Sequence, residues 1–170
     1  MPRPFLMYPD RRLMGVAAPV MSVDDTLRAL WDEMLEAMYA MPGVGLAAPQ
    51  IGVALRAIVV DASDGARTPL RMANPEIVHA SGQMRTHLEG SPNIPGLWAE
   101  VDRPRAVTVA YLDEGGQRAE RDLVGLWATS VQHQIDHLEG RLFIDRLKPV
   151  KRRMLVEKHL KAMKKRERMR

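Results

Sequence analysis

Residues 124–139 constrain the fold of this 170-residue sequence more than any other segment, because they combine a predicted helix with two histidines. The helix is expected to stop at Gly140. His133 and His137 lie four residues apart, roughly 40° around a helix, so both imidazoles leave the same face. Two such histidines can form two ligands of a divalent metal site, and they also occur as ordinary hydrogen-bonded histidines. The general base of HExxH sites is absent, because Gln134 follows the first histidine.

A β-rich middle section precedes this helix. Residues 25–40 place six apolar side chains along one helical stripe, with Ser22 as the expected N-terminal cap. Strands are predicted for four segments: 56–61, 72–79, 106–112 and 117–123. Residues 114–116 predict the hairpin turn between the last two strands.

The C-terminal part predicts a strand-like stretch after Gly140 and then a basic helix over about 150–168. Val156, Leu160 and Met163 form the apolar side of that helix. We therefore expect a single α+β domain over residues 1–170, in which the helix with the two histidines packs against mainly antiparallel sheets.

Composition excludes several classes of protein. The sequence has no cysteine, which rules out a disulfide framework and thiolate metal ligands. No stretch approaches the roughly 18 consecutive apolar residues of a membrane span. The N-terminal residues lack the apolar core of a secretory signal. A soluble cytoplasmic protein without a membrane partner is expected.

Positive charge is concentrated at the C-terminus. Residues 148–170 hold 11 Lys and Arg against two Glu, a net charge of +9, whereas the other 147 residues hold 14 basic and 19 acidic groups, a net charge of −5. A charge run of this kind is either a solvated face or a contact with an anionic surface. The segment has no aromatic residue, so base stacking is not expected, and contact would involve the backbone of a nucleic acid.

Three glycine-containing segments carry most of the functional information: GVGLAAPQIG at 43–52, EGSPNIPG at 89–96 and QHQIDHLEG at 132–140. They resemble the three motifs of peptide deformylases, GxGLAAxQ, EGCLSxPG and QHExDHLxG, in the same order and at similar separations. The N-terminal segment RRLMGVAAPV also looks like the start of that family, so the resemblance covers nearly the whole chain. It implies the deformylase fold, with the central helix that carries HxxxH between antiparallel sheets.

The resemblance also implies a reaction and a set of residues. Deformylases remove the formyl group from the N-terminal formyl-methionine of nascent polypeptides, using a divalent metal that is usually iron and replaceable by zinc or nickel. By position, the metal ligands fall on His133, His137 and Ser91, the proton shuttle on Gln134, and the oxyanion donors on Gln50 and the backbone of residue 92. Substrate-binding positions fall on Val44, Gly45, Gly90, Leu126, Thr129 and Ser130. The basic C-terminal helix would contact the ribosome.

Three of these positions depart from the family pattern. Ser91 replaces the cysteine ligand, and a neutral hydroxyl binds divalent metal poorly. Gln134 replaces the glutamate, and loss of a general base typically costs about 10²–10⁴-fold in rate. Pro92 has no backbone N–H, which removes one oxyanion donor at a typical cost of about 10²–10³-fold in turnover. We expect deformylation to be strongly impaired or lost.

Smaller departures concern the substrate side. Trp98 stands where many members carry an arginine, which is expected to deprive Glu89 of a partner, and Thr129 and Ser130 are expected to make the methionine pocket more polar. Two functions remain open: a divergent hydrolase, acting weakly on formyl-methionine or on another N-acyl substrate, and a silent relative that binds peptides or the ribosome.

Overall fold

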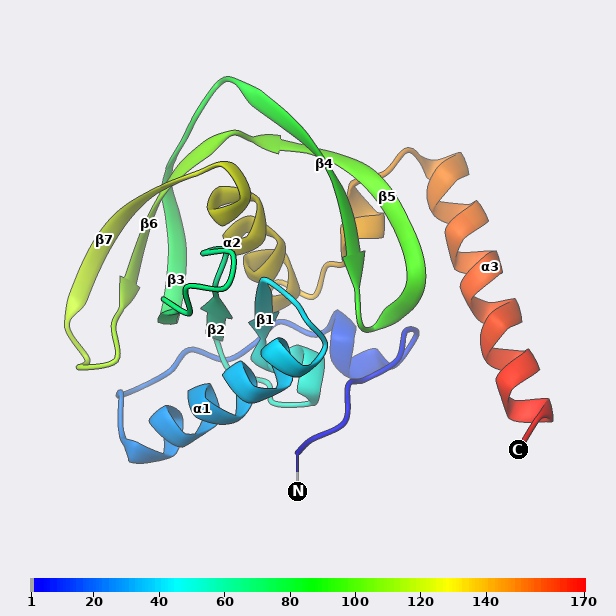
Figure 1. Cartoon of the computed structure of the whole chain (residues 1–170), viewed down its shortest axis with the longest axis horizontal. Helices are drawn as coiled ribbons and strands as arrows, with labels where there is room; N and C mark the ends of the chain where they lie inside the picture. Colours follow the sequence, from blue (N-terminus) through cyan, green and yellow to red (C-terminus); the bar gives the residue numbers. More distant parts are fainter. Residues whose placement is uncertain (1) are drawn as a thin grey trace.

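The computed structural model describes residues 2–170 and has an α+β fold, as the sequence predicts (Figure 1). Its helices are α1 (Asp25–Ala40), α2 (Gly125–Leu138) and α3 (Pro149–Arg168), with short 3₁₀ helices η1 (Arg11–Met14), η2 (Ala48–Ile51) and η3 (Phe143–Arg146). Its strands are β1 (Gly45–Ala47), β2 (Ala57–Val60), β3 (Leu70–Ala80), β4 (Met84–Ser91), β5 (Ile94–Pro104), β6 (Ala106–Leu112) and β7 (Arg118–Val124). No helix within residues 2–170 combines the length and the apolar character needed to cross a bilayer.

The strands form two antiparallel sheets around α2. A five-stranded sheet has the order β1-β2-β3-β6-β7, and β4 pairs with β5 in a two-stranded sheet. Helix α2 lies under the arch of strands in Figure 1 and contacts β1, β2, β6 and β7 of the large sheet as well as β5. This central position of the helix with the two histidines is the one predicted from the sequence.

Three apolar clusters hold these layers together. Trp31, Met34 and Met38 of α1 are inaccessible to solvent and pack against β1 and β2. Buried side chains of α2 pack on the other face of the large sheet, and a third cluster joins β5, η3 and the N-terminal segment. Since burial of apolar surface stabilises by roughly 25 cal/mol per Å², these clusters fix α2 between the two sheets.

Three sequence expectations were wrong in detail. The cap of α1 is Asp24, whose carboxylate accepts the backbone N–H of Leu27 at 2.9 Å, and not Ser22. The stretch after Gly140 forms the short helix η3 and not a strand. Strands β4 and β5 were not predicted, because the prolines and glycines between 90 and 96 interrupt the pattern, although every second residue of β5 from Leu97 to Arg103 is buried.

Helix α3 lies at one side of the molecule (Figure 1), and His159 is its one buried residue. The imidazole Nε2 of His159 donates to the carbonyl oxygen of Tyr8 at 2.7 Å. Leu155 and Val156 pack against the third cluster, whereas Leu160, expected on the docked side, is 37% exposed. The helix therefore docks along its first half through a narrower strip than its sequence indicated.

The backbone of Gly140 packs so closely against the backbone of Met14 that a side chain at position 140 would clash. Its φ is +74°, and a Cβ there would lie 2.5 Å from the carbonyl oxygen of Met14. We predict that Gly140→Ala lowers the free energy of unfolding by about 1 kcal/mol from the backbone and by a further 1–3 kcal/mol, roughly, from the clash. Gly65→Ala is the matched control, because Gly65 has φ +89° with open space around it. Equal losses for the two variants in urea unfolding would contradict this account of Gly140.

Candidate functional site

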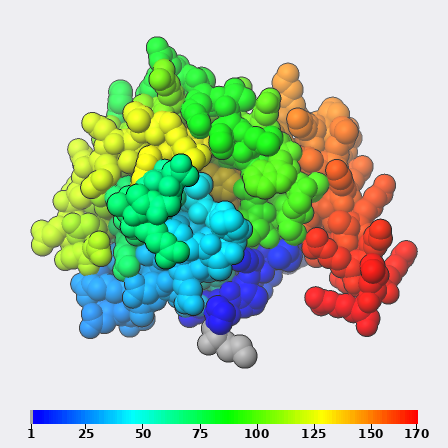
Figure 2. Space-filling view, viewed as in Figure 1, coloured from blue at the N-terminus to red at the C-terminus, as the bar shows by residue number. Residues whose placement is uncertain are grey.

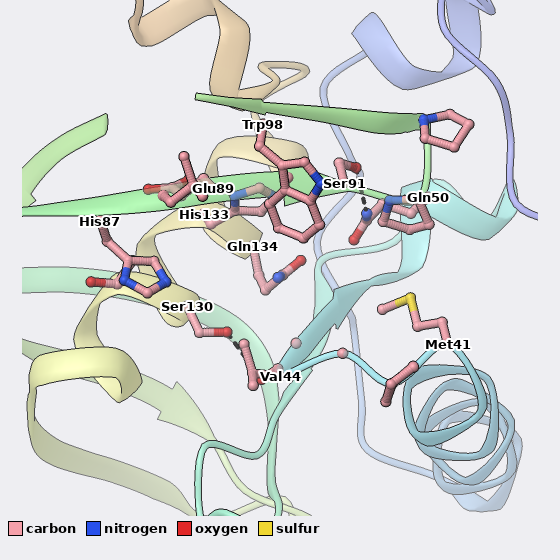
Figure 3. A pocket seen from close by; sticks show the side chains of 18 of the residues that line it. Met41, Val44, Gln50, His87, Glu89, Ser91, Trp98, Ser130, His133 and Gln134 are labelled. Atoms are coloured by element: carbon pink, nitrogen blue, oxygen red, sulfur yellow. Dashed lines mark hydrogen bonds and ion pairs between the residues drawn. The ribbon is translucent and has the colours of Figure 1, made fainter. Parts of the chain in front are cut away.

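A pocket of about 420 Å³ opens between β4 and β5, the segment after α1, and α2 at its base (Figures 2 and 3). Its lining includes ten residues that the sequence singled out: Val44, Gly45, Gln50, Gly90, Ser91, Leu126, Thr129, Ser130, His133 and Gln134. His137 is fully buried and lies behind this surface. Segments that are far apart in the sequence thus converge on one cavity.

Two glycines allow this convergence. A Cβ at Gly45 would lie 2.4 Å from the Oγ of Ser130 and 2.6 Å from the Nε2 of Gln134, so only glycine lets α2 approach β1 this closely. A Cβ at Gly90 would lie 2.6–2.8 Å from ring atoms of Trp98. The indole, which is 60% exposed, therefore rests directly on the backbone of Gly90 at the edge of the pocket.

The two histidines bond to each other. Their Nε2 atoms are 3.2 Å apart, and the Nδ1 of His133 lies 2.7 Å from an oxygen of Glu89. Complete burial, and then the positive charge of nearby Arg103, lower the pKa of His137 well below its usual value, so this imidazole is neutral. If His133 donates its Nδ1–H to the carboxylate, its Nε2 accepts the proton of His137, whose Nδ1 then keeps a lone pair. That Nδ1 has no hydrogen-bond partner among residues 2–170.

A buried charge network supports the histidine pair from behind. Arg103, 1% exposed, donates to both oxygens of Glu89 at 2.7 and 2.9 Å and to Asp136 at 2.9 Å. Arg146 donates to both oxygens of Asp136 at 2.9 and 2.7 Å. Glu89 therefore has two partners, Arg103 and His133, although position 98 carries no arginine that could be a third. Asp136 anchors α2 through Arg103 and Arg146.

The hydroxyls of Thr129 and Ser130 in the pocket are hydrogen-bonded to other residues of the protein. Arg85 donates to the Oγ1 of Thr129 at 2.9 Å, and Ser130 donates to the carbonyl oxygen of Val44 at 3.0 Å. Because these two hydroxyls are already hydrogen-bonded, Thr129 and Ser130 add less polarity to the pocket than free hydroxyls would. His87 also lines the pocket, where burial and then the charge of Arg85 lower its pKa. Sequence reasoning gave it no function, although its position two residues before Glu89 in a strand places it on the same face.

Comparisons with known proteins identify the family. The family profile described as polypeptide deformylase matches residues 2–153. The chain belongs to the peptide deformylase family. It is 49% identical over 167 residues to the peptide deformylase of Methylocella silvestris, covering 95% of this chain and 85% of that protein. Its fold matches the crystal structure of a peptide deformylase from Legionella pneumophila with a TM-score of 0.91 and 41% identity, covering 99% of both chains.

A further solved relative contains a ligand. The peptide deformylase of Ehrlichia chaffeensis in complex with actinonin matches with a TM-score of 0.87 and 35% identity, covering 93% of this chain and 95% of that one. Family membership and fold thus stand as the sequence predicted.

The residues of this deformylase relative do not fit the three-ligand metal site that the family motifs imply. The Nε2 atoms of His133 and His137 have the spacing of two ligands, but residues 2–170 contain no group of three His, Cys, Asp or Glu that could hold a metal ion. Ser91 donates to the Oδ1 of Asn93 at 3.0 Å and accepts from the backbone N–H of Asn93 at 3.3 Å. A ligating histidine normally donates its second ring N–H, and the described residues offer His137 no acceptor for it.

Of the two oxyanion donors implied by the family motifs, one is already hydrogen-bonded within the protein and the other is missing. The side-chain Oε1 of Gln50 accepts the backbone N–H of Ala47 at 2.8 Å. Its Nε2 donates to the Oδ1 of Asn93 at 2.7 Å and lies 3.5 Å from the Oγ of Ser91. Pro92 has no N–H to offer. Ser91, Asn93 and Gln50 therefore form a neutral network where the family motif has an anionic ligand, and Asn93 is a member that sequence reasoning missed.

The charge network makes the fold sensitive to acid. Burial alone would raise the pKa of Glu89, but hydrogen bonds from His133 and Arg103 lower it from 4.5 to about 2. Its stabilising contribution, roughly 3 kcal/mol, is complete above about pH 4.5 and is lost as the pH falls towards 2. Asp136 acts in the same direction, because Arg146 and Arg103 lower its pKa against the effect of burial. The urea midpoint should fall steeply below pH 4.5, and a constant midpoint down to pH 3 would contradict this assignment.

Proposed function

We propose that this protein binds peptide amino termini in the pocket but removes the formyl group from formyl-methionyl peptides far more slowly than efficient deformylases do. The observation that carries the proposal is the neutral network of Ser91, Asn93 and Gln50 beside a glutamine at position 134. An amide cannot take a proton from water at neutral pH and return it to a leaving amine. Without an anionic ligand, two neutral imidazoles hold a divalent metal weakly.

Retention of peptide binding is supported by the shape of the site. Strand β1 is at the edge of the large sheet, where β2 is its one partner among the described strands. Residues 43 and 44, which lead into the strand, and its first residue, Gly45, line the pocket. An extended peptide that adds to such an edge gains backbone hydrogen bonds, while pockets select its side chains. The opposite wall offers the apolar surfaces of Trp98, Leu97 and Pro95.

We further propose that α3 contacts ribosomal RNA, which would place the protein at nascent chains in the cytoplasm. The helix lies within the +9 segment, and most of its surface is exposed at one side of the molecule (Figure 2). Contact through Lys and Arg with a phosphate backbone weakens steeply with salt. Co-sedimentation with ribosomes should therefore occur at about 50 mM salt and be lost at roughly 200 mM. Equal sedimentation at both salt concentrations would contradict this part of the proposal.

The main test measures binding and turnover together. Isothermal titration of the wild-type protein with formyl-Met-Ala-Ser should give saturable binding, and a formate assay on the same sample should show little product. Purified protein should contain much less than one metal ion per chain. Efficient formate release by the wild type would overturn the impairment, and the absence of peptide binding would overturn the binding function.

A further inference from the structure

His87 is a polar side chain of the pocket wall that has no hydrogen-bond partner among residues 2–170. It is partly exposed on β4 and lies on the same side of the cavity as Ser130 (Figure 3). The imidazoles of His133, His137 and His159, in contrast, each bond to another residue. A neutral imidazole always carries one N–H. This N–H is therefore available to a ligand in the pocket.

Arg85 brings a positive charge to the same wall. Arg85 and His87 lie two residues apart in β4, so both side chains leave the strand on one face. The guanidinium of Arg85 donates to the Oγ1 of Thr129 at 2.9 Å, and Thr129 lines the pocket. Because this oxygen accepts in that bond, the hydroxyl hydrogen stays available as a second donor. Arg85, His87 and Thr129 together form a donor cluster.

The described carboxylates leave the charge of Arg85 unbalanced. None of the ion pairs within residues 2–170 involves Arg85. The register of β4 with β5 places it directly opposite Arg103, where like charges repel. Glu89 and Asp136 both bond to Arg103, and Asp136 bonds to Arg146 as well. Three arginines thus share two carboxylates, and the excess positive charge lies at Arg85.

The pKa of His87 responds to the same positive field. Burial and then the charge of Arg85 lower this pKa, and the opposing effect of Glu89 is smaller. A negatively charged group beside His87 would be attracted by this field. Hydrogen bonds to an ionised acceptor are also roughly twice as strong as those to a neutral one. The donor cluster therefore favours a ligand that brings an anionic acceptor.

We infer that the donor cluster takes an acidic side chain, so that the pocket prefers a peptide whose first residue carries a carboxylate over one that begins with methionine. The inference rests on the proposed peptide-binding function and names the class of ligand for that site. A peptide that lies along residues 43–45 has β4 on its other side, and a side chain that points towards α2 reaches His87 and Thr129. Glutamate suits this position, because it is similar to methionine in length and ends in two acceptor oxygens.

Isothermal titration with four peptides tests the inference: formyl-Glu-Ala-Ser, formyl-Gln-Ala-Ser, formyl-Met-Ala-Ser and formyl-Met-Ala-Glu. The wild type should bind formyl-Glu-Ala-Ser about 10- to 100-fold more tightly than formyl-Met-Ala-Ser, the range expected for hydrogen bonds to a charged group. Formyl-Gln-Ala-Ser should lie between them, because its side chain has an acceptor without a charge. Formyl-Met-Ala-Glu has the net charge of the first peptide but a different site for its carboxylate, so it should bind no better than formyl-Met-Ala-Ser.

Two variants separate the charge of the donor cluster from its hydrogen bonds. Arg85→Met should abolish the preference for glutamate over glutamine and keep that for glutamine over methionine, since His87 remains. The fold should tolerate this change, because it removes the like charge opposite Arg103. His87→Leu should weaken both preferences. His79→Leu is the matched control and should keep both, because His79 is exposed on β3 and does not line the pocket.

The outcomes distinguish this inference from the proposed function. Equal affinity for the peptides that begin with glutamate and methionine would overturn the inference and leave peptide binding in place. An equal gain for formyl-Met-Ala-Glu, or a preference for glutamate that survives in both variants, would overturn it too. Failure of all four peptides to bind would overturn the proposed function together with the inference.

Discussion

The triple variant Ser91→Cys, Pro92→Leu, Gln134→Glu should release formate from formyl-Met-Ala-Ser at least about 10³-fold faster than the wild type, measured as kcat/KM with nickel or ferrous iron. Restoring a general base is worth about 10²–10⁴-fold and an oxyanion donor about 10²–10³-fold, and such effects are not additive. The scaffold should accept these changes, because glutamate matches glutamine in shape and cysteine is close to serine in volume.

A double variant provides the control for this experiment. Ser91→Cys with Pro92→Leu restores the thiolate and the N–H but keeps Gln134, so it should bind metal and remain slow. Metal content measured on the wild type, the double variant and the triple variant separates ligation from base catalysis. If the triple variant gains metal but less than about tenfold in kcat/KM, the impairment does not lie in these three residues.

Removal of Arg103 should have the largest effect on stability. Arg103→Met leaves Glu89 and Asp136 buried, with one partner fewer each, and breaking a buried charge pair in this way typically costs about 3–5 kcal/mol. The loss would arise from the carboxylates left behind, since a buried ion pair as a whole need not stabilise a fold. Urea unfolding at pH 7 measures this difference.

Arg152→Met is the matched control for that variant. Arg152 pairs with Asp145 at 2.9 Å, but its side chain is 40% exposed, and exposed pairs contribute about 0–1 kcal/mol. Similar losses for the two variants would mean that the network behind the histidines has no special importance for stability.

Much of the site followed from sequence because most of its residues lie in three short motifs. Within α2, the spacing of His133 and His137 alone places both imidazoles on one face. The structure brings ten of the candidate site residues, together with Glu89, Pro92 and Trp98, into one pocket. The losses at Ser91, Pro92 and Gln134 could also be read from the residue types alone. Serine and glutamine carry no charge, and proline has no backbone N–H.

The remaining features depend on contacts between distant segments. Asn93 completes the neutral network by reaching Gln50, 43 residues away, and Arg103 reaches Asp136, 33 residues away. Asn93 lies within the second motif, but the motif alone does not show that it reaches Gln50, and no local pattern marks Arg103. The pairing of β4 with β5 was hidden by Pro92 and Pro95. The hydrogen-bond partners of Thr129 and Ser130 reduce the polarity that their hydroxyls were expected to add to the pocket.

The most direct test of the central claim is the kcat/KM of the wild-type protein for formyl-Met-Ala-Ser, measured at high enzyme concentration with saturating nickel or ferrous iron. Efficient enzymes typically reach about 10⁴–10⁸ M⁻¹s⁻¹. The neutral site around Gln134 and Ser91 predicts a value below about 10² M⁻¹s⁻¹, at least a hundredfold under that range. A value within the range would contradict the claim that these substitutions impair deformylation.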